Sequence, residues 1–318
     1  MPWVLLGTGE KLEYDRLILA TGASAFVPPA KGADLPGCFV LREAADAQST
    51  RSWRQEMQCT RAVVLGGGVL GVEAADSLRR LNLHTTIVQR SERLMDRELD
   101  EKGSAILRRF LDGLGMDVVT GASAAAILGE DRVREVELDN GSILPAEIFV
   151  ACAGIRANTA IAVDAGLEVN RGVVVDDHMR TSDPKIFAVG DVAELPGTLG
   201  GLWTIGTAQA EVAASAVFGK DAAYEAPSAL VSLKVEGIDV KAFGSREVGD
   251  DVEEIHDSAE PDNLHRKMFV KDGRAVGAVF VGPPGTGKEI ARIIQQRLEV
   301  SNVLDRLRRF EWSALEDV

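Results

Sequence analysis

Short apolar runs alternate with helical stretches through the middle of the chain. The runs RAVVL and HTTIVQ have the length of buried strands, and VEAADSLRRL lies between them. The segment DEKGSAILRRFLDGLG then carries apolar residues at helical spacing, at Ile106, Leu107, Phe110, Leu111 and Leu114. A period-2 pattern surrounds Asn140-Gly141, which predicts a hairpin, and IFVACAG follows as a buried strand. The order predicts a parallel sheet that carries one antiparallel excursion.

The two ends of the chain show different patterns. The runs WVLL and KLEYDRLILAT flank the turn residues Gly7, Thr8 and Gly9, which predicts a hairpin, and a Pro/Gly-rich connection follows. Residues 166–225 supply short strands, turns and an alanine-rich helix. From about residue 226 the pattern is β-rich, and the apolar face of EIARIIQQRL predicts one helix. We therefore expect a separate C-terminal α+β domain.

Composition and charge narrow the function classes. The 318 residues suggest about two domains, and 35 basic against 49 acidic side chains give a net charge of −14. So negative a chain repels nucleic acid and anionic membranes, and no apolar run reaches the ~20 residues of a membrane span. No signal peptide is visible. The three cysteines and four histidines form no metal-ligand or redox pattern, so we expect no metal site and a cytoplasmic location.

One glycine motif carries chemistry. Gly66-Gly67-Gly68-Val69-Leu70-Gly71 has the spacing G-x-G-x-x-G, and it joins the strand AVVL to a predicted helix inside a βαβ unit. In such a unit Gly66 permits a tight turn, Gly68 lets the backbone approach a pyrophosphate, and Gly71 lets helix and strand pack closely. The helix N-terminus offers N–H groups and partial positive charge to the phosphates. The motif therefore predicts dinucleotide binding.

The residue that ends the second strand leaves the choice of dinucleotide open. An NAD site usually has Asp or Glu there to bond the ribose, whereas this chain has Gln89 followed by Arg90. Gln89 can bond a hydroxyl group without repelling a 2′-phosphate, and Arg90 could attract one. Both NADH and NADPH remain open.

A second glycine-rich segment suggests a rival function. GPPGTGKE at residues 282–289 nearly matches the P-loop of nucleotide triphosphatases. Glu289 stands where a Ser or Thr hydroxyl should reach Mg²⁺, and no clear strand ending in a metal-binding Asp follows. The alternative is an ordinary Pro/Gly loop before an amphipathic helix, so the P-loop NTPase is kept as a remote candidate.

Several segments together resemble the FAD-dependent pyridine nucleotide–disulfide oxidoreductase family. The chain looks most like the branch of rubredoxin and ferredoxin reductases and of the flavin-bearing part of NADH-dependent nitrite reductases. The segments that carry the resemblance are YDRLILATGA, LPGCFVLREAADAQ, GGGVLGVEAA, VACAGIRAN and IFAVGDVAE. The resemblance covers nearly the whole chain.

The resemblance implies an α/β fold with two Rossmann-like three-layer domains and a C-terminal α+β interface domain. We expect an FAD-binding domain from residues 1–43 and 166–225, an NAD(P)-binding domain at 44–165 and the interface domain at 226–318. The family begins with its own βαβ unit for the ADP half of FAD, whereas here Met1 lies just before the hairpin that follows that unit. We therefore expect an incomplete FAD domain beside a complete NAD(P) domain.

The resemblance also implies a role for individual residues. Asp191 would accept a hydrogen bond from the FAD ribityl chain, Thr21 and Gly22 would line the FAD groove, and Arg42 would approach FAD from the linker. The segment Trp203–Gln209 would approach the flavin ring, with the helix near Thr207 pointing its positive end at the ring. Glu73 would lie near the nicotinamide ribose and Gly154 on the nicotinamide side. No side chain is expected to act as an acid or base, because the cofactors carry the chemistry.

The function that follows is hydride transfer from NAD(P)H to FAD and electron delivery to an acceptor. The acceptor would be a rubredoxin- or ferredoxin-type protein, a sirohaem nitrite reductase module or oxygen, and a homodimer stays open. The chain has no C-x₄-C pair for disulfide reduction. The alternative function is a non-catalytic NAD(P)-binding remnant.

Overall fold

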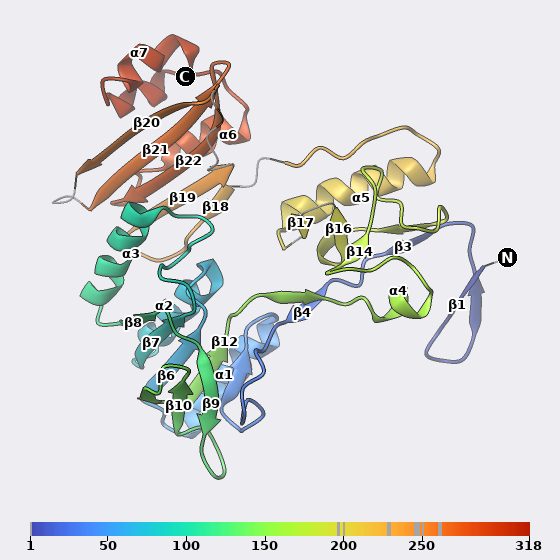
Figure 1. The fold of residues 1–318 in the computed structure, drawn as a ribbon, viewed down its shortest axis with the longest axis horizontal. Coiled ribbons are helices and arrows are strands. Elements are labelled where there is room, and N and C mark those ends of the chain that lie inside the picture. Colours follow the sequence, from blue (N-terminus) through green and yellow to red (C-terminus); the bar gives the residue numbers. More distant parts are fainter. Residues whose placement is uncertain are drawn as a thin grey trace. The chain divides into compact units, whose positions relative to one another are not determined.

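The computed structural model describes residues 2–195, 198–199, 201–227, 230–244, 249, 251–259 and 263–318, with only the backbone at 198–199. The chain divides into two compact units. Unit 1 consists of Met1–Ser24 and Ile155–Ala229, and unit 2 consists of Ala25–Gly154 and Leu230–Val318. Helices and strands carry the labels of Figure 1.

A five-stranded parallel sheet forms the centre of unit 2, in the order β5-β12-β6-β7-β8 (Figure 1). Its strands are β5 (Cys38–Val40), β12 (Ile148–Ala151), β6 (Arg61–Leu65), β7 (His84–Gln89) and β8 (Asp117–Thr120). The helices associated with it are α1 (Ala44–Glu56), α2 (Val69–Arg80) and α3 (Glu101–Gly113). The succession β6-α2-β7-α3-β8 is the strand–helix alternation predicted from the apolar runs.

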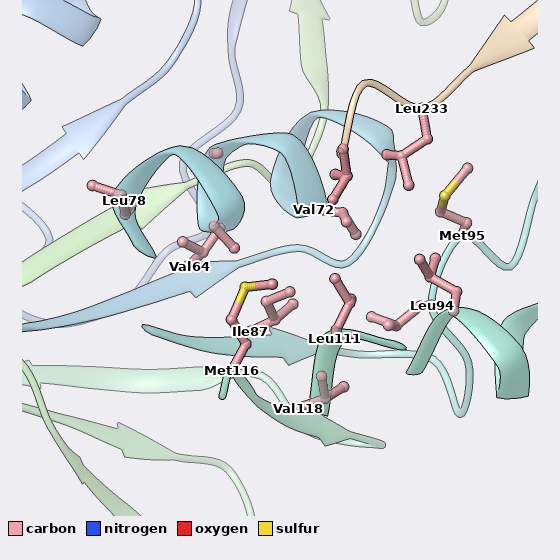
Figure 2. Packing of buried hydrophobic residues seen from close by; sticks show 14 of the residues in the cluster. Val64, Val72, Leu78, Ile87, Leu94, Met95, Leu111, Met116, Val118 and Leu233 are labelled. Atoms are coloured by element: carbon pink, nitrogen blue, oxygen red, sulfur yellow. The ribbon is translucent and has the colours of Figure 1, made fainter. Parts of the chain in front are cut away.

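Alternation along the central strands produces three layers. Ala62 and Val64 of β6 pack with α2 and α3 in one apolar core, whereas Val63 and Leu65 face a second core. Figure 2 shows the first core, in which side chains of α2, α3, β6 and β7 meet. The second core is closed by an antiparallel sheet of β9 (Ala124–Leu128), β10 (Glu135–Leu138) and β11 (Ile143–Pro145). The parallel sheet is thus buried on both faces, as its near-continuous apolar strands require.

Turn residues with positive φ fix two of the hairpins of unit 2. Gly141 has a φ of +84° between β10 and β11, a conformation that glycine adopts without steric cost. Asp272 and Gly273 have φ of +49° and +71° between β21 and β22, and positive φ at both central residues matches the twist of a tight hairpin. The hairpin at Gly141 lies where the sequence predicts it.

The C-terminal part of unit 2 is a five-stranded antiparallel sheet with one covered face. Its order is β18-β19-β22-β21-β20, from β18 (Leu230–Ser232), β19 (Asp239–Gly244), β22 (Arg274–Gly282), β21 (Leu264–Lys271) and β20 (Glu253–Ala259). Ala278 and Phe280 of β22 pack against α6 (Lys288–Gln295), α7 (Leu304–Leu307) and the 3-10 helices Ser301–Val303 and Trp312–Asp317. The predicted apolar face of α6 is buried through Ile290, Ile293 and Ile294.

The opposite face of this sheet is fused to the parallel-sheet domain. Val279 and Val281 of β22 belong to the same core as α2 and α3, together with Leu233, Val235 and Ile238 from the β18–β19 connection. Figure 2 shows Leu233 beside Val72 and Met95. The C-terminal sheet therefore completes the core of the parallel-sheet domain.

Polar contacts cross the same junction. Asp100, the N-cap of α3, accepts hydrogen bonds from the Gly103 N–H at 3.0 Å and from His265 Nε2 at 2.9 Å. Lys267 Nζ lies 3.2 Å from the same carboxylate. Burial alone would raise the pKa of Asp100, but these hydrogen bonds and the positive charge hold that pKa well below its usual range.

Unit 1 is built from small sheets around one long helix. Its apolar core contains residues of β3, β15 and α5, among them Leu19, Phe187 and Ala213. The pairs are β1 with β2, β3 with β15, and β4 with β13, and a three-stranded sheet has the order β14-β16-β17. The strands are β1 (Trp3–Leu5), β2 (Lys11–Glu13), β3 (Leu17–Leu19), β4 (Ala23–Ala25), β13 (Ile155–Ala157), β14 (Val173–Val174), β15 (Ile186–Ala188), β16 (Ala193–Leu195) and β17 (Thr198–Leu199). The helices are α4 (Ala160–Asp164), α5 (Trp203–Val217) and the 3-10 helix η1 (Gly190–Val192).

The predicted fold class is confirmed by the parallel-sheet core and the C-terminal antiparallel sheet. The division into 1–43 with 166–225, 44–165 and 226–318 stays a prediction, because the structure groups the chain into two units. Residues 25–43, which we assigned to the FAD domain, group with the parallel-sheet domain, and β5 is its edge strand. None of the described helices is both long and apolar enough to cross a membrane.

The shared core makes a testable statement about stability. Leu233 is 4% exposed, so Leu233→Ala should lower the free energy of unfolding of unit 2 by about 2–5 kcal/mol. Ile143→Ala, at a strand residue that is 54% exposed in the same unit, should change it by about 0.5 kcal/mol or less. Calorimetric melting compares the two variants. Equal melting temperatures would show that the β18–β19 connection does not belong to this core.

Candidate functional site

The glycine turn lies at the carboxyl edge of the parallel sheet. Residues 66–68 connect the end of β6 to the start of α2, and Gly68 is the N-cap of that helix. Ligands of open parallel sheets bind at this edge, outside the ends of the strands. The predicted position of the motif, between a strand and a helix, is therefore the observed one.

Two of the glycines are required by close backbone contacts. A Cβ at Gly71 would lie 1.8 Å from the carbonyl oxygen of Gly66, and a Cβ at Gly66 would lie 2.3 Å from the carbonyl oxygen of Cys152. Gly68 differs, because a Cβ there would meet nothing within 4 Å. Gly66 and Gly71 thus permit the packing of strand and helix, and Gly68 presents bare backbone to open space.

The middle of the turn is held from two sides. The Gly67 N–H donates to Gln89 Oε1 at 2.8 Å, and the Gly67 carbonyl accepts from the Met95 N–H at 2.8 Å. Met95 is buried and has a φ of +47°, which is uncommon for a residue with a side chain. The loop after β7 thereby folds back onto the glycine turn. Sequence reasoning missed Met95, because its role is a backbone contact that leaves no residue-type signal.

The N-terminus of α2 suits an anionic group. The first turn of a helix has N–H groups without intrahelical partners, and they carry partial positive charge. The Gly68 N-cap provides no side-chain hydrogen bond, and the first turn contains no acidic residue. Val69 and Leu70 are the first two residues of the helix, and Leu70 is 44% exposed. A phosphate approaching Gly68 would meet N–H groups and no built-in carboxylate.

The other predicted nucleotide residues come from β7, from the segment after β12 and from α2 itself. Gln89 ends β7, and Arg90 is exposed directly after it. Gly154 follows β12 at the same edge of the sheet with a φ of +109° and open space at its Cβ position. Glu73, in the second turn of α2, accepts a hydrogen bond from the Lys234 N–H at 2.8 Å. Its contact in this structure is therefore with the β18–β19 connection.

A cavity of about 310 Å³ lies beside the loop after β7. Arg93 and Leu94 of that loop line it, together with Ser104 and Arg108 of α3 and Thr120 at the end of β8. The Arg108 guanidinium is held by the Val118 carbonyl at 3.0 Å. The cavity extends the glycine-turn edge of the sheet toward β8.

The predicted flavin residues of unit 1 form two groups. Thr21 and Gly22 are joined to Asn158: Thr21 Oγ1 donates to the Asn158 carbonyl at 2.8 Å, and Asn158 Nδ2 donates to the Thr21 carbonyl at 2.9 Å. Gly22 has a φ of +65° and open space at its Cβ position. Asn158 ends the segment VACAGIRAN, but sequence reasoning did not identify it as a site residue.

The second group lies where η1 meets α5. The Gly190 N–H donates to Gln209 Oε1 at 2.7 Å, and Gln209 is 2% exposed. Asp191 is the next residue of η1. Trp203 begins α5 and is 90% exposed, and Thr207 Oγ1 donates to the Trp203 carbonyl at 3.0 Å. The α5 N-cap, Leu202, provides no side-chain hydrogen bond, so this helix also presents a positive N-terminus.

Arg42 belongs to the other unit. Its backbone N–H donates to Asp46 Oδ2 at 2.8 Å, next to the start of α1. The structure therefore joins Thr21 and Gly22 to Asn158, and it places Asp191 beside the helix of Trp203 and Thr207. It groups Arg42 with the parallel-sheet domain. The predicted roles of all these residues toward a flavin stay predictions.

Acidic side chains gather around one histidine of unit 1. Asp176, Asp177 and His178 place ligand atoms within 4.8 Å of one another. Both ring nitrogens of His178 already have carboxylate partners, Asp177 at 2.6 Å and Asp221 at 2.8 Å. Hydrogen bonds to Asp221 and Asp177 raise the pKa of His178. The group ties the segment after α5 to the turn at 176–178, and the expectation of no metal site stays a prediction.

A carboxylate of the chain, that of Asp239, already occupies the helix start of the P-loop-like segment. The Gly287 N–H, at the start of α6, donates to Asp239 Oδ2 at 2.9 Å, and Lys241 Nζ lies 3.3 Å from the same carboxylate. A Cβ at Gly287 would lie 2.2 Å from Lys241 Cγ, and Lys288 points to solvent with 82% of its side chain exposed. A phosphate at this helix start would have to displace Asp239. These contacts favour the Pro/Gly-loop interpretation.

All three cysteines are free and none is activated. Burial, with a contribution from Asp34, raises the pKa of Cys38 to about 11, and burial raises the pKa of Cys152 to about 12. Burial and the nearby Glu147 raise the pKa of Cys59. The thiolate is the reactive form, so the chain offers no thiol suited to redox exchange.

Two family models match the chain. The pyridine nucleotide-disulphide oxidoreductase model matches residues 4–216, and the rubredoxin NAD+ reductase C-terminal domain model matches residues 230–298.

Individual proteins align over most of the chain. The nitrite reductase [NAD(P)H] of Bacillus subtilis (strain 168) is 33% identical over 289 residues, which are 91% of this chain and 36% of that protein. The rubredoxin-NAD(+) reductase of Pseudomonas putida is 34% identical over 244 residues, 74% of this chain and 63% of that protein. The crystal structure of a ferredoxin reductase from Rhodopseudomonas palustris superposes with a TM-score of 0.78 at 26% identity, and the match covers 94% of this chain and 74% of that one. The chain spans about a third of the length of several curated relatives that it matches.

The glycine contacts predict opposite results for two similar substitutions. Gly71→Ala should lower the free energy of unfolding by about 1–3 kcal/mol or more, although alanine is the better helix former, because its Cβ would collide with the Gly66 carbonyl. Gly68→Ala should change it by about 0.5 kcal/mol or less, since its φ of −78° suits alanine and its Cβ position is open. Thermal melting measures both. A stable Gly71→Ala variant would contradict this geometry.

The thiol environments predict slow alkylation in the folded chain. Because the pKa of Cys38 is raised to about 11 and that of Cys152 to about 12, their thiolate fractions should rise about tenfold per pH unit between pH 8 and pH 10. Iodoacetamide labelling followed by mass spectrometry should show the same rise in rate. The chain unfolded in guanidinium is the control, and its rate should level off near pH 9. A folded cysteine that reacts completely at pH 7 would contradict the burial of these thiols.

Proposed function

This chain belongs to the pyridine nucleotide-disulphide oxidoreductase family, and from that premise we propose that it is a flavoprotein that takes hydride from NAD(P)H and passes electrons to an acceptor protein. The C-terminal match supports the reductase branch that the sequence motifs resemble. The observation that carries the proposal is the glycine turn at α2. Its Gly68 backbone faces open space, and the helix N-terminus behind it has no side-chain cap.

The residues around the turn fit a dinucleotide. The N–H groups of the first α2 turn would hold the pyrophosphate, and the bare backbone of Gly68 would let it approach. Gln89 and Arg90, at the end of β7, would face the adenosine ribose. Gly154, on the neighbouring strand end, would leave room for the nicotinamide side. A Cβ at Gly66 would collide with the carbonyl oxygen of Cys152, so the packing of the turn requires glycine at this position whether or not a ligand is bound.

The described residues of unit 1 fit the ring and ribityl part of FAD. The uncapped N-terminus of α5 would place partial positive charge near the flavin, which favours its reduced, anionic form. Gln209 holds the Gly190 N–H and so fixes the turn that carries Asp191, the expected partner of the ribityl chain. The open Gly22 would allow close approach of the cofactor to the backbone.

FAD and NAD(P)H, when bound, supply the redox chemistry through hydride transfer from the nicotinamide to the flavin. The chain's own residues would bind and orient the two cofactors and exclude water from them, and no side chain is expected to transfer a proton. The protonated, separate thiols of Cys38, Cys59 and Cys152 argue against a dithiol step within this chain. Electrons would therefore leave from the flavin to an external acceptor.

The proposed acceptor is an iron–sulfur or rubredoxin-type protein or a sirohaem nitrite reductase module. Support comes from the relatives described as a nitrite reductase and a rubredoxin reductase. The net charge of −14 suits an acceptor that presents basic groups. A homodimer and a cytoplasmic location remain predictions.

The decisive variant is Gly68→Asp, which would place a carboxylate where the pyrophosphate should lie. It should weaken NADH binding by at least about 100-fold, because charge repulsion replaces several hydrogen bonds to phosphate. NADH titration of the full chain measures binding, and the loss of flavin absorbance under anaerobic conditions measures hydride transfer. Gly7→Asp is the matched control, since it adds the same charge at an exposed turn with open space.

Three outcomes separate the candidate functions. Binding and flavin reduction that are lost together in Gly68→Asp would support the proposal. Equal NADH affinity of the wild type and Gly68→Asp would refute the assignment of the glycine turn. NADH binding by the FAD-loaded wild type without any flavin reduction would favour the non-catalytic nucleotide-binding alternative.

A further inference from the structure

We propose that Asp96 supplies the carboxylate that faces the adenosine ribose, and that it makes the chain prefer NADH to NADPH. The proposal rests on the dinucleotide site proposed above and identifies a specificity residue within it. The sequence alone left this choice open, because the residue that ends β7 is Gln89, which carries no charge.

The amide of Gln89 is already engaged in the empty fold. Its Oε1 accepts the Gly67 N–H at 2.8 Å, so its acceptor atom is used to brace the glycine turn. Its Nε2 donates to the Ser91 hydroxyl and lies 3.3 Å from Asp96 Oδ1. One of the two lone pairs of Gln89 Oε1 is therefore used by the turn, and the amide has no charge with which to select against a 2′-phosphate. The carboxylate in contact with the Gln89 amide is that of Asp96.

Backbone contacts hold Asp96 at this place. Its neighbour Met95 donates its N–H to the Gly67 carbonyl at 2.8 Å, and the Met95 carbonyl accepts from the N–H groups of Glu98 at 2.9 Å and Leu99 at 2.7 Å. The side chains of Leu94 and Met95 are 1% and 0% exposed and anchor the loop in the core shown in Figure 2. The position of Asp96 is thus fixed by the same turn that would hold the pyrophosphate.

The anchored carboxylate has a clear electrostatic consequence. A ribose 2′-hydroxyl can donate a hydrogen bond to a carboxylate, whereas a 2′-phosphate brings about two negative charges toward it. In this fold class an acidic group about 20 residues after the glycines normally selects NAD for this reason. Here the acid comes seven positions after the strand-end residue and reaches the site because the loop folds back.

Three arginines on the same loop, Arg90, Arg93 and Arg97, would have the opposite effect. All three are exposed, and among the described residues none of them has an ion-pair partner. Exposed charges on long, unanchored side chains are screened by salt and lose entropy when they are fixed. Asp96 is partly buried and held at Gln89, so its effect should dominate.

The test compares the affinities of NADH and NADPH, measured by titration of the full chain at physiological ionic strength. The wild type should bind NADH at least about 10-fold more tightly than NADPH. Asp96→Asn should weaken NADH binding about 10-fold and leave NADPH binding unchanged or tighter, so the preference should shrink by about 10-fold or more. Asp96→Glu keeps the charge and should keep a preference for NADH.

The matched control is Glu92→Gln, which removes a carboxylate from the same loop at a residue without a hydrogen bond to Gln89. It should leave the ratio of affinities within about twofold of the wild type. An unchanged ratio in Asp96→Asn, or an equal loss for both nucleotides, would overturn the proposal and leave Asp96 a structural residue. A wild type that prefers NADPH would overturn it as well. A wild type that binds neither nucleotide would instead refute the dinucleotide site itself.

Discussion

The contact between helix α2 and strand β6 governs the geometry of the candidate site. The Gly71 backbone lies so close to the Gly66 carbonyl that a Cβ would come within 1.8 Å of its oxygen. This approach directs the helix N-terminus at the open space beside Gly68. The hydrogen bonds of Gly67 to Gln89 and Met95 then connect the turn to β7 and to the loop after it. One tight backbone path therefore positions the helix dipole, the strand-end residue and the specificity loop together.

The C-terminal sheet takes part in the core on which this arrangement rests. Its β22 strand gives alternate residues to two cores, and the core of α2 and α3 is incomplete without Leu233 and Val281. Glu73 bonds the Lys234 backbone, and Asp100 joins the cap of α3 to His265. Because Glu73 and several residues of the shared core belong to α2, the helix whose N-terminus would hold the pyrophosphate, the C-terminal sheet helps to hold that helix in place. The acidic residues involved are thereby used for assembly of the fold.

Local patterns predicted the fold well, and contacts between distant segments limited the prediction of the site. The glycine spacing, the helical spacing of Ile106 and Leu107, and the turn at Asn140-Gly141 each depend on a few consecutive residues, and all three lie where expected. The partners of Glu73 and Gly287 come from segments far away in the chain, Lys234 and Asp239, and no local pattern encodes them. The positive φ of Met95 could not be predicted from the sequence either, since a buried methionine usually indicates only packing. The sequence was therefore enough to predict the dinucleotide turn, but not to identify Asp96 as the residue proposed to contact the ribose.

Hydrogen–deuterium exchange of the full chain with and without NADH tests the central claim most directly, because it reports which backbone amides a nucleotide covers. The account predicts slower exchange in peptides that contain residues 66–72 and 89–96, since these amides lie in the turn, the first turn of α2 and the loop bound to it. Peptides that contain residues 282–289 should not change, because Asp239 already occupies that helix start. Protection of 282–289 with no change at 66–72 would contradict the account.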